Sequence, residues 1–112
     1  MMVHRPGEAA RNATAAHAGR PATAIIHDCA DARLVVFRID PGQRVPPHTS
    51  GSTVILTVIA GTGMVTGGDE ERPVSAGDVV TYAPGELHGM RAAEDGEPLL
   101  LLATITPRPG SR

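Results

Sequence analysis

Short runs of β-branched and aliphatic residues alternate with glycine- and proline-rich turns along most of the chain. These runs occupy residues 23–28, 32–40, 52–60, 63–75, 77–85 and 98–107. Val, Ile and Thr favour strands, because a branched Cβ loses rotamer freedom in a helix. The pattern predicts an all-β domain of six or more short strands, a sandwich or a barrel, with no helix strong enough to assign.

Two of the turns carry specific backbone signals. In the pair Pro41 and Gly42, proline presets φ at the second position of a type II turn and glycine accepts the positive φ of the third. Within residues 63–75, the pair Gly67 and Gly68 is typical of the tight turn of a hairpin. Both turns favour antiparallel neighbours in the predicted sheets.

The run 52–60 is apolar on both of its faces. Val54, Leu56 and Val58 alternate with Ile55 and Ile59, so neither face is polar. A strand of this kind packs one face in the core and the other against a second sheet or subunit. We therefore expect a homodimer, with Ile55 and Ile59 on the buried outer surface.

The two ends of the chain differ from its centre. Residues 1–22 are rich in Ala and Arg and present no strong apolar stripe, so we expect a mobile N-terminal arm. Residues 23–107 form the predicted domain, and residues 108–112 are expected to be a frayed tail.

Composition limits the kinds of partner that we expect the protein to bind and the cellular compartment in which we expect it. A length of 112 residues fits one domain, and a net charge of −2 gives no basic field for nucleic acid or for an anionic membrane. Phe37 and Tyr82 are the only aromatic residues, which argues against base stacking, and no apolar run reaches membrane-spanning length. The single cysteine, Cys29, and the lack of an apolar leader favour a cytoplasmic protein.

Glycines and histidines recur at characteristic spacings in the centre of the chain. Gly42, His48, Ser50, Val54 and Gly61 follow one another with five, one, three and six residues between them. This segment resembles the first motif of the cupin superfamily, also called RmlC-like, which is G-x5-H-x-H-x3-4-E-x6-G. The two glycines and the first histidine match, whereas serine replaces the second histidine and valine replaces the glutamate.

The second cupin motif, G-x5-P-x-G-x2-H-x3-N, has a partial counterpart further along. Gly77, Gly85 and His88 match it, Pro84 is displaced by one position, and Ala92 stands in place of the asparagine. Over residues 33–106 the resemblance implies a double-stranded β-helix, or jelly-roll, forming a cupin barrel with a pocket lined by both motifs. It also implies a dimer, and in typical members a divalent metal held by three histidines and the glutamate.

Only two of those four metal ligands, His48 and His88, are present. Two imidazoles with water in the other positions bind a divalent ion weakly, since valine cannot ligate and a neutral serine hydroxyl ligates poorly. We therefore favour a protein without a tightly held metal. The alternative is a metal on His48 and His88 with a third ligand, for which His27 is a candidate.

The resemblance and the strand periodicity together define a predicted ligand pocket. Met90 is two residues beyond His88, so it faces the same side of a strand. The candidate ligand-binding residues are His48, Ser50, Val54, Tyr82, His88 and Met90.

Two classes of function fit these residues. One is a protein that binds a small, partly apolar molecule. The other is an enzyme, either a metal-dependent dioxygenase or decarboxylase with a reduced ligand set, or a metal-free isomerase or cyclase that uses histidine as acid and base. The missing metal ligands weigh against the metal-dependent enzyme. The sequence does not distinguish a binding protein from a metal-free enzyme.

Overall fold

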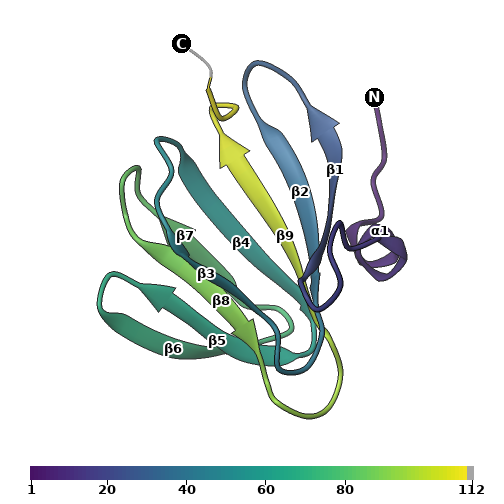
Figure 1. Cartoon of the computed structure of the whole chain (residues 1–112). Coiled ribbons are helices and arrows are strands. Elements are labelled where there is room, and N and C mark those ends of the chain that lie inside the picture. The colour runs from purple at the N-terminus through teal and green to yellow at the C-terminus, as the bar shows by residue number, and fades with distance from the viewer. Residues whose placement is uncertain (111–112) are drawn as a thin grey trace.

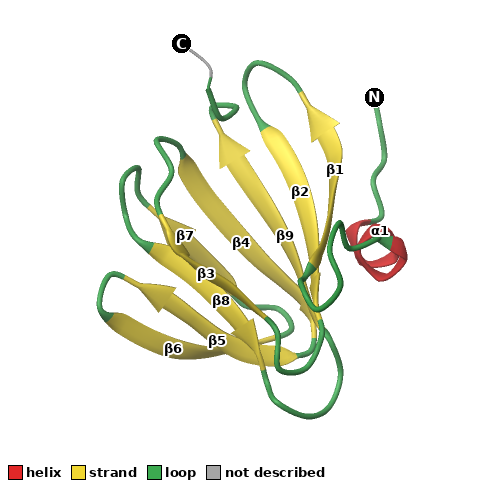
Figure 2. Cartoon of the chain, viewed as in Figure 1, coloured by secondary structure: helices red, strands yellow, loops and turns green. Residues whose placement is uncertain are grey.

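The structure, a computed structural model, describes residues 1–110. Strands dominate it, with one short helix near the N-terminus (Figures 1 and 2). The elements in chain order are α1 (Pro6–Asn12), β1 (Ala22–Asp28), β2 (Arg33–Ile39), β3 (Arg44–His48), β4 (Thr53–Ala60), β5 (Thr62–Gly67), β6 (Glu70–Ser75), β7 (Val79–Tyr82), β8 (His88–Ala92) and β9 (Leu99–Thr106). Within the described residues, no helix is long and apolar enough to span a membrane.

The strands form two antiparallel sheets. One has five strands in the order β1-β2-β9-β4-β7, and the other has four in the order β3-β8-β5-β6. In Figure 1 the two sheets converge at one end and spread apart toward the other. This arrangement confirms the predicted all-β jelly roll, as two facing sheets that do not join into one closed barrel.

The core lies between the two sheets, on the inner face of the five-stranded one. Along β4, Val54, Leu56 and Val58 are buried, while Ile55 and Thr57 between them are half-buried. The two-residue period of the strand produces this alternation, because successive side chains leave opposite faces. The inward-facing side chains of β9 follow the same alternation and continue this apolar surface.

Strand β3 was not predicted, because its sequence, RVPPH, contains two residues that cannot donate to a ladder. The structure accommodates Pro46 and Pro47 at the edge of the four-stranded sheet, where backbone N–H groups need no second strand. Gly89 on β8 permits the approach, since a Cβ there would lie 3.1 Å from the Cα of Pro47. Close packing of the proline segment on β8 brings His48 beside His88.

Both predicted turns are present. The N–H of Gln43 donates to the carbonyl of Asp40 over 2.9 Å, and Gly42 has a φ of 81°. The hairpin between β5 and β6 turns after Gly67, which pairs with Glu70. These signals are local, which is why the sequence sufficed to locate them.

The N-terminal segment differs from the expected mobile arm, because residues 6–13 pack on the domain. Ala10 of α1 is fully buried against Val36 and Leu100 on the outer face of the five-stranded sheet. Small residues make this contact, the buried Ala10 together with the partly buried Ala9, so the helix has no strong apolar stripe that its sequence would reveal.

A side chain of the sheet also fixes the end of helix α1. Nη1 of Arg38 donates to the backbone carbonyls of Arg11 over 2.7 Å and of Ala13 over 2.8 Å. The last carbonyls of a helix have no partner within it, and a cation there is favourable. Arg38 thereby links strand β2 to the helix. The alternation of apolar and polar residues along a strand does not reveal such a link, because it is made by one charged side chain and backbone carbonyls.

The predicted frayed tail is partly outside the described residues, which end at Gly110. Its described part folds back on the β1–β2 turn. The N–H of Arg108 donates to the carbonyl of Ala30 over 3.4 Å, and its guanidinium pairs with Asp28 over 2.9 Å. These contacts place Arg108 beside the β1–β2 turn, at the spread end of the two sheets.

Candidate functional site

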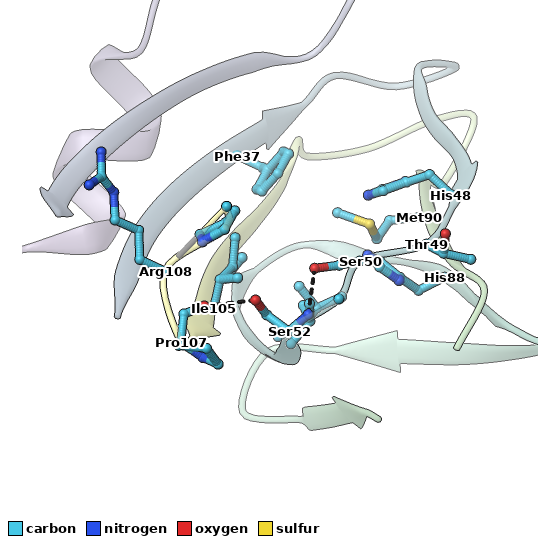
Figure 3. Close-up of a pocket in the computed structure, with 16 residues that line it drawn as sticks. Phe37, His48, Thr49, Ser50, Ser52, His88, Met90, Ile105, Pro107 and Arg108 are labelled. Atoms are coloured by element: carbon cyan, nitrogen blue, oxygen red, sulfur yellow. Dashed lines mark hydrogen bonds between the residues drawn. The ribbon is translucent and has the colours of Figure 1, made fainter. Parts of the chain in front are cut away.

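A cavity of about 710 Å³ opens between the sheets at their spread end (Figure 3). Its walls come from β2, β4, β8 and β9, and its rim from the β3–β4 loop and the segment after β9. The lining residues are Phe37, His48, Thr49, Ser50, Gly51, Ser52, Val54, Leu56, His88, Met90, Ala103, Ile105, Pro107, Arg108, Pro109 and Gly110. Five of the six candidate residues, all except Tyr82, are among them.

His48 and His88 face each other across strands β3 and β8. The strand register pairs them directly, and their ring centroids are 4.2 Å apart with the planes tilted by 57°. His48 is exposed at the cavity mouth, whereas His88 is only 4 % exposed. One imidazole is thus open to solvent, and the other is enclosed behind it.

In both histidines, Nδ1 forms a hydrogen bond with a backbone carbonyl. Nδ1 of His48 lies 3.0 Å from the carbonyl of Pro46, and Nδ1 of His88 lies 3.0 Å from the carbonyl of Glu86. A carbonyl only accepts, so Nδ1 must carry the proton in each bond. In the neutral rings the lone pair is then on Nε2, where it is available to a ligand.

Tyr82 packs beside the ring of His88 and does not line the main cavity. Its ring lies 4.9 Å from that of His88, and its hydroxyl donates to the carbonyl of Thr66 over 2.9 Å. Burial and, secondly, the charge of Glu86 raise the pKa of Tyr82 to about 12. Tyr82 lines a smaller cavity of about 210 Å³ beside Glu86, so the structure separates it from the other candidates.

Ser50 and Val54 both lie at the cavity, in different environments. The Ser50 hydroxyl accepts the N–H of Ser52 over 3.1 Å, while its carbonyl accepts the N–H of Gly85 over 2.7 Å. Ser50 therefore shapes the turn before β4, as short hydroxyl residues commonly do. Val54 is 4 % exposed and contributes only apolar surface to the wall.

The tail after β9 contributes part of the rim, which the sequence did not indicate. The hydroxyl of Ser52 donates to the carbonyl of Pro107 over 2.7 Å, which links the β3–β4 loop to this segment. Ser52 is 5 % exposed, so the bond is protected from solvent. Phe37 and Ile105 are further lining residues that sequence analysis assigned only to strands, since their periodicity matches that of any core residue.

No acidic side chain lines the cavity in the described part of the chain. The one fixed charge is Arg108, whose side chain points away from the cavity in Figure 3 and pairs with Asp28. The hydrogen bond from Arg33 and the charge of Arg108 lower the pKa of Asp28, which keeps this partner ionised. The described lining therefore combines apolar walls with two imidazoles and the hydroxyl residues Thr49, Ser50 and Ser52, and carries no acidic side chain.

Comparisons with known proteins agree with this geometry. Residues 35–105 match the family model described as the cupin domain. The chain belongs to the cupin family. No curated protein matches it.

Several solved structures share the fold. A double-stranded β-helix protein of uncharacterized function from Klebsiella pneumoniae has a TM-score of 0.82 at 23 % identity, covering 96 % of this chain and 91 % of that one. An RmlC-like cupin from Desulfovibrio desulfuricans has a TM-score of 0.78 at 25 % identity, covering 96 % and 97 %. A predicted oxalate decarboxylase from Thermotoga maritima has a TM-score of 0.76 at 24 % identity, covering 95 % and 99 %.

The residues present do not fit the divalent metal that the family implies. Among residues 1–110 no group of three or more His, Cys, Asp or Glu side chains is placed to hold an ion. His27, the candidate third ligand, lies instead beside His4, with ring centroids 5.5 Å apart, and does not line the cavity. The remaining donors of the family type are two imidazoles with no carboxylate.

Proposed function

We propose that this cupin binds a small, partly apolar molecule in the cavity beside His48 and His88, without a tightly held divalent metal. The observation that carries the proposal is the chemistry of the walls. The cavity has the size of a small-molecule site, and side chains such as Phe37, Leu56 and Ile105 supply apolar surface. Few polar groups converge on it, as is usual where orientation depends on one or two contacts.

The polar end of the ligand is inferred from the histidine pair. Each neutral ring offers Nε2 as an acceptor, which suits a hydroxyl or an acid group that donates. When protonated, the same rings donate and suit an anion, and no acidic lining residue opposes it. An apolar body with one hydroxyl or carboxyl group therefore matches the cavity best.

A matched pair of tryptophan variants tests this proposal. Thr49 lies at the exposed mouth of the cavity, so Thr49→Trp blocks entry at little cost to folding. Thr81→Trp adds the same bulk at an exposed position of β7 outside the cavity lining. A panel of small phenols, aliphatic acids and aromatic acids is screened by thermal shift and calorimetry, with native mass spectrometry of the purified protein. We expect binding by the wild type and Thr81→Trp, and loss in Thr49→Trp. Binding that survives Thr49→Trp would contradict the proposal, as would a panel without binders.

Metal-free acid–base catalysis is a second candidate, because both Nδ1 atoms are fixed and both Nε2 atoms are free. A base needs an available lone pair near neutral pH, which this arrangement supplies. Its test is deuterium exchange from solvent into a bound carbonyl compound, followed by NMR. Exchange that falls in His48→Asn and His88→Asn would support catalysis. Binding without exchange would contradict catalysis and support a function in binding alone. The metal-dependent decarboxylase alternative lacks support, since the site has no carboxylate ligand.

A further inference from the structure

We propose that the cavity also binds one cuprous ion, through Nε2 of His48, Nε2 of His88 and the thioether of Met90. This inference does not depend on the organic ligand proposed above. It replaces the hard, carboxylate-containing site of the family with a neutral site of two nitrogens and one sulfur. Three features of the site support it: the fixed imidazoles, the position of the sulfur and the absence of negative charge.

The imidazoles already have the surroundings of metal ligands. Histidines that bind metal usually donate their other ring N–H to a carboxylate, a backbone carbonyl or water, which fixes the tautomer and the ring. The carbonyls of Pro46 and Glu86 do this for His48 and His88, each over 3.0 Å. The ring centroids are 4.2 Å apart, and from this closeness we infer that one ion is shared by the two Nε2 atoms. Bonds from imidazole to such an ion are roughly 2 Å long.

The sulfur comes from the same strand as the buried histidine. Met90 is two residues after His88 on β8, so both side chains leave the same face, and both line the cavity. Met90 is 4 % exposed, and Figure 3 shows its thioether between the ends of the two imidazoles. The sulfur and the two imidazoles therefore line one cavity and are drawn close together there.

Charge and softness decide which ion fits. Thioether ligands select soft cuprous copper, whereas carboxylate, carbonyl and water ligands suit magnesium, calcium and manganese. Among residues 1–110 the lining contains no acidic side chain, so the proposed ligands leave the ionic charge uncompensated. Because burying a charge is costly, a monovalent ion suits such a site better than a divalent one. Val54, at the family's glutamate position, thus changes the preferred ion as well as weakening the site.

The experiment is an anaerobic titration with cuprous ion alone, in competition with a chromogenic chelator. The variants are His48→Ala, at an exposed position, and Met90→Leu, which conserves core volume and usually folds. The chain offers two matched controls. Met64→Leu alters a half-buried methionine that lines a separate groove, and His27→Asn alters the other adjacent histidine pair. Zinc is titrated in parallel.

We expect one tightly bound cuprous ion per wild-type chain and much weaker zinc. Loss of one ligand should weaken cuprous binding by about tenfold or more in Met90→Leu and His48→Ala, and neither control should change it. X-ray absorption of the loaded wild type should show a sulfur scatterer. Unchanged affinity in Met90→Leu would overturn the proposal, as would a spectrum with nitrogen and oxygen only, or equal losses in His27→Asn.

Discussion

The ring of Tyr82 packs beside that of the buried His88, with centroids 4.9 Å apart and planes tilted by 35°. His88 also contacts the exposed ring of His48, so its imidazole touches one buried ring and one exposed ring. The phenol is held by the carbonyl of Thr66 and takes no part in the main cavity. Tyr82 is therefore a positioning residue for His88.

The first prediction concerns alkaline pH. The pKa of Tyr82 is raised to about 12 in the folded protein, above the usual value of 10.0 for a tyrosine. Below pH 10 the phenol is neutral in both states, so this group contributes no pH dependence. Between pH 10 and 12 the unfolded chain ionises first, and the free energy of unfolding should fall. The chain contains a single tyrosine and no lysine, so few other groups titrate there.

Denaturant titrations at several pH values between 9 and 12 would measure this fall. Tyr82→Phe keeps the ring beside His88 but has no ionisable group, so its stability should depend less on pH in that window. An equal alkaline fall in Tyr82→Phe would assign the effect to another group. A constant stability in the wild type would show that the phenol is not buried.

The second prediction concerns helix α1. Arg38→Ala removes the donor to the Arg11 and Ala13 carbonyls, and a hydrogen bond to a charged group contributes about 1.5–3 kcal/mol. We expect a loss of about 1–3 kcal/mol in urea unfolding, and a comparable or larger loss when residues 1–13 are deleted. Arg72→Ala is the control, since its ion pair with Glu70 is exposed and should contribute little to stability. Unchanged stability on deletion would favour the mobile arm expected from the sequence.

The third prediction concerns the rim of the cavity. Ser52→Ala removes the 2.7 Å bond to the carbonyl of the exposed Pro107, at a cost of about 0.5–1.5 kcal/mol. Segment 107–110 should then loosen, and hydrogen exchange at the Arg108 amide should accelerate. Ser75→Ala is the comparison, because the Ser75 side chain is exposed on β6. Equal exchange at Arg108 in both variants would show that Ser52 does not hold the rim.

Local signals accounted for most of the fold. The density of Val and Ile predicted β4, and the cupin resemblance implied that His48 and His88 line one pocket. Helix α1 and the rim at Pro107 depend on contacts between distant segments, namely Arg38 with Ala13 and Ser52 with Pro107. Their residue types are common on surfaces and in turns, so no periodicity identifies them.

The fourth prediction is the homodimer. Ile55, Thr57 and Thr104 lie half-buried on the outer face of the five-stranded sheet, next to Leu102, which packs against the cluster around Ala10 of α1. We propose that a second copy covers this surface. Ile59 is no longer a candidate, since α1 packs on it: a Cβ at Gly7 would lie 3.3 Å from its side chain.

Light scattering at micromolar concentration should show a dimer, and Ile55→Lys should yield a folded monomer. Val79→Lys, at an exposed residue nearer the sheet edge, is a milder comparison. A monomeric wild type would contradict the proposal. A dimer unaffected by Ile55→Lys would place the interface on another surface.

The fifth prediction restores the family's divalent site. Ser50 and Val54 line the same cavity as His48 and His88, so Ser50→His with Val54→Glu should complete a set of three histidines and one carboxylate. The wild type, prepared without a histidine tag or added metal, should carry far less than one divalent ion per chain. The double variant should carry close to one, as elemental analysis would measure.

The metal-free double variant should be less stable than the wild type for two reasons. A buried carboxylate without a partner is costly at a position only 4 % exposed, and the Ser50 hydroxyl no longer accepts the Ser52 N–H. A divalent ion that binds only the folded state should then restore the melting temperature. Val54→Glu alone separates the contributions, since it adds the carboxylate without the third imidazole. Near-stoichiometric divalent metal in the wild type would contradict the prediction. A double variant that gains no metal would show that these two side chains do not converge with the histidines.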